Sequence, residues 1–335
     1  SLARFTPDYV AERTELDKND IIAAARLFAA GPRGTASTGT GPEMGPHPNL
    51  IQHLVQTINA ICGRHYRAGE KLPNAGVLGP EAPRYAQAVP PNPEWLQGVR
   101  SRVSDDIGEV TVLTANGPIK EMPTAVCADE ILMEGEGQIK ALICIGGNPV
   151  LAWPGQEKAH EALKSLDLLV CIDYKLSATA EMADYVIGSK LCLEREDLTV
   201  LTDIWYEEPY SHYTKTVVEA EGDVIEEWEL FWELGKRLGL NMSINQQHPL
   251  DMENCPTKYD VLSKMTTDSR VPLEDIYGRE GGHTYDIPDV VIQPADPTTA
   301  GRMDLFPEGL SEEIESAVRD ADASLLAKSD YPYLL

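Results

Sequence analysis

The chain reads Ala141-Leu-Ile-Cys-Ile-Gly-Gly-Asn-Pro-Val150, then Leu168-Leu-Val-Cys-Ile-Asp173, then Leu176-Ser-Ala-Thr-Ala-Glu-Met-Ala-Asp-Tyr-Val-Ile187. The apolar runs in this stretch are short, unbroken and rich in β-forming residues, which is typical of strands buried on both faces of a parallel sheet. Between the first two runs, residues 153–165 have helical spacing, with Pro154 near the first turn. The pattern predicts a β-α-β unit.

Polar residues and glycines follow these strands where the chain leaves the predicted sheet. Gly146, Gly147, Asn148 and Pro149 follow the first strand, and Asp173 ends the second. Open α/β sheets bind ligands at the carboxyl ends of their strands. Glycine lets a diphosphate approach the backbone while nearby amides face its charge. The pattern therefore indicates a nucleotide site, with a simple tight β-to-α turn as the alternative.

Three other polar positions near this edge have both a binding and a structural interpretation. Asp173 stands 26 positions after Gly147, where dinucleotide-binding folds place an acid on a ribose or base, but Asp is also common in caps and turns. Thr179 could donate to the nucleotide or cap the short helix that follows. Asp184 precedes an apolar run, which favours a structural turn acid over a ligand.

The order of these pieces resembles the molybdopterin oxidoreductase family, whose large catalytic subunits carry molybdenum or tungsten on two molybdopterin guanine dinucleotides. The family pattern is a strand ending in Gly-x-Asn-Pro, a helix, a strand ending near an acid, and a Thr-Ala-x-x-Ala-Asp-x-Val segment. Residues 146–149, Asp173 and residues 179–186 match it in that order. The resemblance implies that Gly146, Gly147, Asn148, Pro149, Asp173 and Thr179 bind the cofactor.

A glycine-rich turn upstream extends the resemblance. Gly39-Thr-Gly-Pro-Glu-Met-Gly45, followed by an amphipathic helix over residues 49–63, looks like the turn and long helix with which the family approaches its pterin or substrate funnel. The resemblance adds Gly41 and Glu43 to the candidate cofactor-binding residues. The sequence names no catalytic residue and no metal ligand.

Several parts of a complete family member have no counterpart in this sequence. Family members are usually longer, with a cysteine cluster for an iron–sulfur centre, a Cys, selenocysteine, Ser or Asp ligand to the metal, and a final β-barrel. The six cysteines here are scattered, without a C-x-x-C pair. We therefore expect a central portion of a larger enzyme that is inactive alone, with any iron–sulfur cluster in the missing N-terminal region.

The resemblance implies two-electron redox of a small substrate, such as formate or an oxyanion, at a molybdenum or tungsten centre. The expected partners are the remaining domains or subunits, including an iron–sulfur electron-transfer subunit. One alternative is a non-catalytic acidic α/β subunit or degenerate paralogue that scaffolds partner chains. Another is a Rossmann-like enzyme with a nicotinamide cofactor, against which stands the lack of a full Gly-x-Gly-x-x-Gly motif.

Composition excludes several other classes of protein. A net charge of −26, from 54 acidic and 28 basic residues, argues against binding to nucleic acid or to an anionic membrane. No run approaches the ~18 apolar residues of a membrane span, so we expect no direct insertion. Unpaired cysteines fit a reducing compartment and hence the cytoplasm. An export signal in a missing N-terminus would place the protein in the periplasm instead.

The predicted fold class is α/β: a Rossmann-like parallel sheet layered with helices, as the central fragment of a larger multidomain enzyme, plus long irregular loops. Residues 1–130 read as a helical and loop-rich part of an α/β domain, residues 131–240 as the Rossmann-like cofactor-binding domain, and residues 241–335 as an extended and helical tail before a missing barrel. Prolines and glycines predict an irregular course from residue 64 to about 130, and residues 225–239 form a second clear amphipathic helix.

Overall fold

The computed structural model describes residues 2–89, 99–105, 107–114, 117–200, 202–245 and 247–326. Contacts within the chain divide it into two compact units. The first comprises Ser1–Glu70, Tyr85–Pro90 and Ile292–Leu335, and the second comprises Lys71–Arg84 and Pro91–Val291. These units do not follow the boundaries predicted at residues 130 and 240, and the three-part division stays a prediction.

Helices form most of the first unit. The carboxylate of Asp17 accepts hydrogen bonds from the amides of Asn19 and Asp20 and so caps α2. In the core of this unit, Leu50 packs with Leu310 and Ile314. The helices are η1 (Leu2–Arg4), α1 (Pro7–Thr14), α2 (Lys18–Ala30), α3 (Thr40–Glu43), α4 (Pro48–Ile61) and α11 (Leu310–Leu326).

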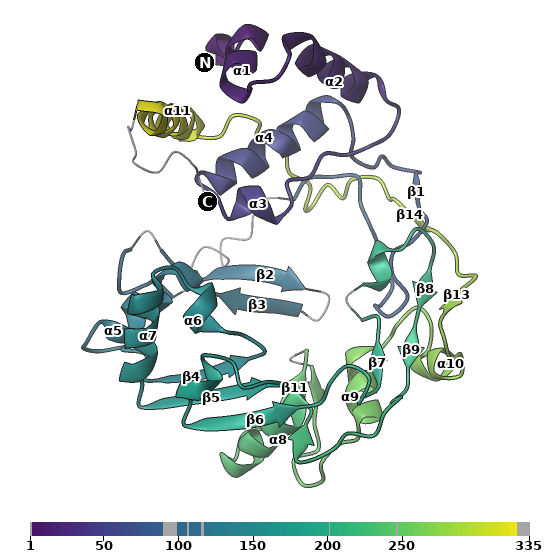
Figure 1. Ribbon diagram of the computed structural model, residues 1–335. Coiled ribbons are helices and arrows are strands. Elements are labelled where there is room, and N and C mark those ends of the chain that lie inside the picture. The colour runs from purple at the N-terminus through teal and green to yellow at the C-terminus, as the bar shows by residue number, and fades with distance from the viewer. Residues whose placement is uncertain are drawn as a thin grey trace. The chain divides into compact units, whose positions relative to one another are not determined.

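A parallel sheet organises the second unit (Figure 1). Its strands are β4 (Ala141–Ile145), β5 (Leu168–Asp173), β6 (Tyr185–Ser189) and β10 (Val224–Ile225), in the spatial order β10-β6-β5-β4. Ala141 lies opposite Leu168 and Ile145 lies opposite Ile172. The predicted β-α-β unit and the α/β fold class are therefore confirmed.

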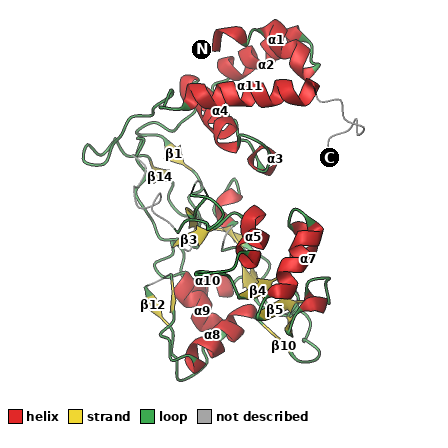
Figure 2. Ribbon diagram, turned by 90° about the vertical axis from the view of Figure 1, so that its left-hand side faces the viewer, coloured by secondary structure: helices red, strands yellow, loops and turns green. Residues whose placement is uncertain are grey.

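Two helices, rather than the single one predicted over residues 153–165, connect β4 to β5. They are α6 (Pro149–Ala152) and α7 (Gln156–Ser165), and Gly155, with φ of +70°, separates them. The helices α5 (Cys127–Leu132), α6 and α7 lie together on one side of the sheet (Figures 1 and 2). Val150 of α6 and Leu163 of α7 pack with Cys144, Leu169 and Cys171. In a second cluster, Ala128 and Ile131 of α5 pack with Ala162 of α7.

The opposite face of the sheet is open along β4 and at the start of β6, but Ile172 of β5, opposite Ile145 on that face, is buried. Ile143, Ile145 and Tyr185 are 40, 48 and 65% exposed. Because side chains alternate along a strand, these residues point away from the face that carries Cys144 and Cys171. The prediction of burial on both faces is therefore wrong for β4, whereas in β5 Cys171 and Ile172, which point to opposite faces, are each 1% exposed as predicted.

The segment from residue 64 to 130 is less irregular than predicted. β1 (Lys71–Leu72) pairs with β14 (Val290–Val291), and β2 (Val110–Thr114) pairs with β3 (Gly117–Glu121) in an antiparallel hairpin. η3 (Thr124–Val126) then leads into α5. The prediction of an irregular course is therefore wrong from Val110 onwards.

Short strands and helices complete the second unit. A second core cluster gathers Val77, Leu78, Val271, Ile276 and Tyr285. None of the helices in the described ranges is both long and apolar enough to cross a bilayer. The remaining elements are η4 (Ala180–Met182), β7 (Asp197–Leu198), η5 (Asp203–Trp205), β8 (Tyr210–Ser211), β9 (Tyr213–Thr214), α8 (Glu227–Arg237), β11 (Ser243–Ile244), β12 (His248–Pro249), α9 (Lys258–Met265), α10 (Leu273–Tyr277) and β13 (His283–Thr284).

Candidate functional site

The loop after β4 begins in a left-handed backbone conformation at Gly146. Its φ is +57°, and no atom lies within 4 Å of the place where a Cβ would stand. The amide of Gly146 donates to the carbonyl oxygen of Ile172 at 2.9 Å, so the loop after β4 is bonded to the end of β5. A side chain in this conformation would cost about 1–2 kcal/mol and would fill the open space. Glycine thus keeps the backbone accessible here.

Asn148 is held in one orientation by a buried neighbour. Its Oδ1 accepts hydrogen bonds from Thr179 Oγ1 at 2.9 Å and from the amide of Thr179 at 3.3 Å. Because a backbone amide can only donate, Oδ1 must face Thr179, and the Nδ2 group faces away. Nδ2 has no partner among the described residues, so it is a positioned donor without an acceptor.

Thr179 links Asn148 to the start of α6. Its hydroxyl donates to Asn148 and accepts a hydrogen bond from the amide of Val150 at 3.1 Å, and its side chain is fully buried. The interpretation of Thr179 as a cap of η4 is wrong, because its side chain makes no cap hydrogen bond there. Direct contact between Thr179 and a cofactor stays a prediction, and the engaged hydroxyl favours an indirect role through Asn148.

Asp173 ends β5 at the same edge of the sheet. The residue is 8% exposed, and its Oδ1 accepts a long hydrogen bond, 3.3 Å, from the amide of Lys175. Its Oδ2 has no hydrogen-bond partner within the described ranges. Asp173 therefore stabilises its own turn and still presents a free acceptor. Asp184 differs, since its Oδ2 accepts from the amide of Leu169 at 2.8 Å, which agrees with the structural role favoured by the sequence.

Two thiols lie beneath these loops on adjacent strands. Cys144 and Cys171 are opposite each other in the β4–β5 register, and Cys144 Sγ donates to the carbonyl oxygen of Gly147 at 3.3 Å. Burial raises the pKa of Cys171 to about 11 and raises that of Cys144 above its usual range. Both thiols are therefore protonated at neutral pH and act as small apolar groups, as their mid-strand positions predict.

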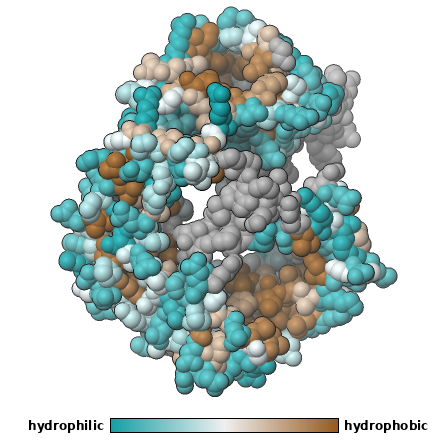
Figure 3. All heavy atoms as spheres, turned by 180° about the vertical axis from the view of Figure 1, so that it is seen from behind, coloured by the Kyte–Doolittle hydropathy of each residue, from teal (hydrophilic) through white to brown (hydrophobic). Residues whose placement is uncertain are grey.

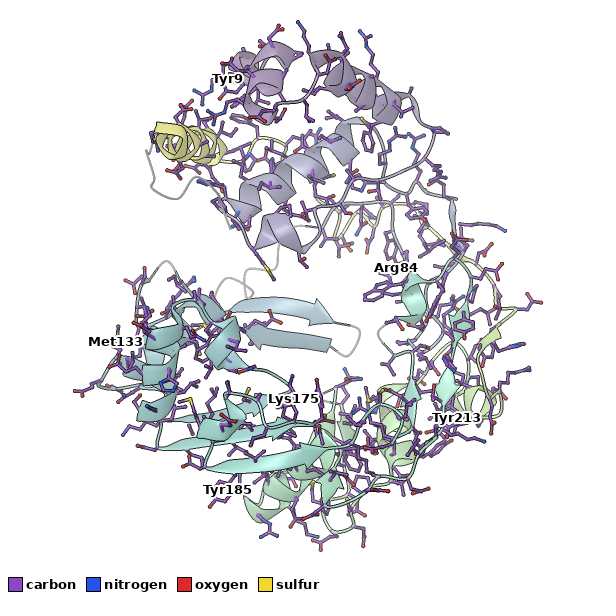
Figure 4. The ribbon with its side chains drawn as sticks, viewed as in Figure 1. Tyr9, Arg84, Met133, Lys175, Tyr185 and Tyr213 are labelled. Carbon is purple, nitrogen blue, oxygen red and sulfur yellow. The ribbon has the colours of Figure 1, made fainter. Side chains whose placement is uncertain are left out.

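Sequence reasoning missed a cation beside this site. Lys175 and Tyr174 directly follow Asp173 and are exposed, and Lys175 Nζ lies 5.7 Å from the centre of the Tyr174 ring. Figure 4 shows Lys175 near the arrowhead ends of the strands, whereas Tyr185 is at the starting end of β6. The signal in the sequence was a lysine next to the predicted nucleotide acid in a chain dominated by acidic residues. The face in Figure 3 is mixed, with hydrophobic patches between hydrophilic areas.

The second pair of candidates, Gly41 and Glu43, belongs to the other unit. Gly41 lies in α3, and no atom lies within 4 Å of its missing Cβ. The backbone of Glu43 ends the same short helix, but its side chain lies outside the described part of the chain. Their contact with a cofactor stays a prediction. Among the described residues, no group of three or more His, Cys, Asp or Glu side chains could hold a metal ion.

The Thr179 network can be tested by its effect on stability. We expect Thr179→Val to lower the free energy of unfolding by about 2 kcal/mol, because it leaves Asn148 Oδ1 without its strongest donor and the amide of Val150 without an acceptor. Urea unfolding followed by circular dichroism measures this. Thr14→Val, which removes an exposed hydroxyl bonded to its own helix, is the control. Equal unfolding midpoints for the two variants would contradict the buried linking role of Thr179.

The model of the family described as molybdopterin oxidoreductase matches residues 37–237. The match covers more than half of the chain and contains both candidate patches. The chain belongs to the molybdopterin oxidoreductase family. This confirms the resemblance inferred from residues 146–149, Asp173 and residues 179–186.

Curated relatives and a solved structure agree with this assignment. The chain is 25% identical over 295 residues to the acetylene hydratase of Syntrophotalea acetylenica, covering 82% of this chain and 40% of the relative. It is 23% identical over 340 residues to a formate dehydrogenase alpha subunit of Methanocaldococcus jannaschii, covering 100% of this chain and 47% of the relative. The chain thus spans less than half the length of these relatives.

The structural comparison concerns the fold alone. The acetylene hydratase from Pelobacter acetylenicus superposes with a TM-score of 0.58 at 19% sequence identity, over 86% of this chain and 40% of that chain. The shared architecture supports the α/β assignment, while substrate and reaction are not transferred by it.

Proposed function

We propose that the edge formed by the loops after β4 and β5 binds the guanine dinucleotide of a molybdopterin cofactor. The complete protein would then be a molybdenum or tungsten oxidoreductase that acts on a small substrate such as formate or an oxyanion. The observation that carries this proposal is the pairing of a free donor, Asn148 Nδ2, with a free acceptor, Asp173 Oδ2, beside the open backbone of Gly146.

The residues present at this edge fit the chemistry of a nucleotide. A diphosphate needs donors and positive charge, which Asn148 Nδ2 and Lys175 can provide, and the lack of a side chain at Gly146 leaves room for the diphosphate to approach. A ribose and a guanine present O–H and N–H donors, for which the carboxylate of Asp173 is the matching acceptor. Hydrogen bonds within the chain already orient the side chains of Asn148 and Asp173, which supports this assignment.

Each residue has a defined task in this proposal. Asn148 donates to the phosphate or sugar, Asp173 accepts from the ribose or base, and Thr179 acts as a positioning residue that fixes Asn148. When bound, a molybdopterin cofactor supplies two-electron redox chemistry at its metal, while the protein binds and orients it. The metal ligand and the catalytic residue would come from parts of the protein that lie outside the described residues.

The proposed partners follow from the family and from the lengths of the relatives. One relative is described as an alpha subunit, and the chain spans 47% of it. We infer that the remaining domains or subunits of the enzyme complete the cofactor site. An iron–sulfur subunit would then carry electrons to or from the metal, and any cluster would be bound outside this chain.

Binding of guanosine diphosphate to the 335-residue chain tests this proposal. We expect saturable binding with one site per chain in a calorimetric titration, because guanosine diphosphate contains the groups that Asp173 and Asn148 would contact. Adenosine diphosphate, which lacks the guanine donors, should bind more weakly. Absence of guanosine diphosphate binding would instead favour the alternative of a non-catalytic scaffolding subunit.

A further inference from the structure

A small basic cavity lies in the first unit. It is lined by residues that follow α2 and by the loop after α4. Its volume is about 80 Å³, several times the ~10–15 Å³ that one water needs. Its wall contains Arg33, Arg64, His65, Arg67 and Glu70. We call it the arginine pocket. Three guanidinium groups around one small cavity are unexpected in a chain of net charge −26.

The positive charge of the arginine pocket is only partly neutralised. Arg33 forms a two-pronged ion pair with Glu70, with Nη2–Oε1 and Nη1–Oε2 distances of 2.8 and 3.4 Å. Arg64 donates to the carbonyl oxygens of Phe28 and Gly31, which are neutral. One carboxylate therefore faces three guanidinium groups, and a net positive charge remains.

Two arginines in the pocket have donors without acceptors. The Nε of Arg64 is buried and has no hydrogen-bond partner among the described residues. A buried donor of this kind normally has a partner, either in the protein or in a bound molecule. The guanidinium of Arg67 makes no hydrogen bond or ion pair within the described ranges, although its backbone amide donates to Glu70 Oε2 at 2.8 Å.

The backbone holds Arg67 in place. Gly63 has φ of +65°, and a Cβ built on it would lie 3.2 Å from Arg67 Nη2. The absence of a side chain at residue 63 thus makes room for the Arg67 guanidinium. The ion pair of Glu70 with Arg33 and its bond to the amide of Arg67 fix the start and end of the same loop. These contacts fix the backbone at Arg67 and leave space for its guanidinium, while the residue itself is exposed and open to an incoming anion.

We propose that the arginine pocket binds a tetrahedral oxyanion of the phosphate class, with Arg67 as its principal ligand. Guanidinium groups bind phosphate through paired, charge-assisted hydrogen bonds. The net charge of −26 on the chain repels anions, so the arginine pocket would be a local region of positive electrostatic potential. The site is independent of the cofactor edge on β4 and β5, because it lies in the other unit and uses other residues.

A calorimetric titration of the 335-residue chain with inorganic phosphate at low ionic strength tests the proposal. We expect saturable binding that Arg67→Gln weakens by about tenfold or more, the loss expected for one charge-assisted hydrogen bond. Arg26→Gln removes the same charge from an exposed position in α2 of the same unit, and we expect it to leave the affinity within about twofold. Circular dichroism confirms that both variants are folded.

Two further titrations test which kind of phosphate the pocket accepts and whether the measured binding occurs in this pocket. Methyl phosphate in place of phosphate asks whether the pocket accepts the end of a phosphate ester or only the free ion. Asn148→Ala asks whether the titrated phosphate binds at the cofactor edge instead. No phosphate binding by the parent chain, equal losses in the two arginine variants, or loss in Asn148→Ala with retention in Arg67→Gln would each overturn the arginine pocket as an oxyanion site.

Discussion

Replacing Asp203 with alanine should lower the free energy of unfolding by about 3–5 kcal/mol, because two charge-assisted hydrogen bonds of ~1.5–3 kcal/mol each are lost. Asp203 is 3% exposed, and its Oδ2 accepts from the amides of Val77 and Leu78 at 2.6 and 2.8 Å. Alanine would leave both amides buried without an acceptor. Urea unfolding followed by tryptophan fluorescence measures the loss.

The backbone of Asp203 takes part in the same arrangement. Its carbonyl oxygen accepts from Asn74 Nδ2 at 2.7 Å, and Asn74 Oδ1 accepts from the amide of Gly76 at 2.9 Å. The turn before Val77 is therefore fixed by Asp203 from both its side chain and its backbone. Asp223→Ala is the matched control, because Asp223 is exposed and its carboxylate makes no hydrogen bond or ion pair with any described residue. We expect that control to change stability by less than about 0.5 kcal/mol.

The parallel sheet and the edge at which we propose cofactor binding were predictable from the sequence because their signals are local. Short apolar runs separated by a helical segment specify a β-α-β unit, and the carboxyl ends of parallel strands lie at one edge. Asn148 and Asp173 could therefore be placed together before the structure was known. Family membership was predictable for a related reason, since the matching residues occupy the strand ends and turns of this same unit.

The contacts that position the site were not predictable, because they join residues distant in the sequence. The role of Thr179 depends on Asn148, which lies 31 positions earlier. The carboxylate of Asp203 accepts hydrogen bonds from two amides that lie more than 120 positions earlier in the sequence. Neither partner is indicated by spacing or by composition. The same holds for the arginine pocket, where the fold brings Arg33 next to Glu70.

Two errors arose from giving one signal too much weight. Many prolines and glycines between residues 64 and 130 suggested an irregular course, although the run Val110-Thr-Val-Leu-Thr114 is rich in β-branched residues and pairs with residues 117–121. The unbroken apolar runs suggested strands covered on both faces, yet Ile145 is 48% exposed. An apolar sequence reports the environment of the complete protein, whereas the exposure is that of this chain alone.

Replacing Asp173 with alanine should weaken guanosine diphosphate binding by about 10- to 150-fold, the equivalent of one charge-assisted hydrogen bond of ~1.5–3 kcal/mol. The prediction rests on the free Oδ2 of Asp173 at the edge that holds Gly146 and Asn148. The only hydrogen bond that the Asp173 carboxylate accepts within the described chain is the long one from the amide of Lys175 to Oδ1. We therefore expect the melting temperature to change little while the affinity falls.

Asp167→Ala is the matched control for this variant, because Asp167 directly precedes the same strand and is 70% exposed at its opposite end. It removes the same charge, so any effect of net charge on nucleotide binding should appear in both variants. Titration calorimetry and thermal unfolding of the three proteins distinguish the two roles of Asp173. A lowered melting temperature with unchanged nucleotide affinity would make Asp173 a structural turn acid. That result would contradict the proposal that its carboxylate accepts a hydrogen bond from the nucleotide.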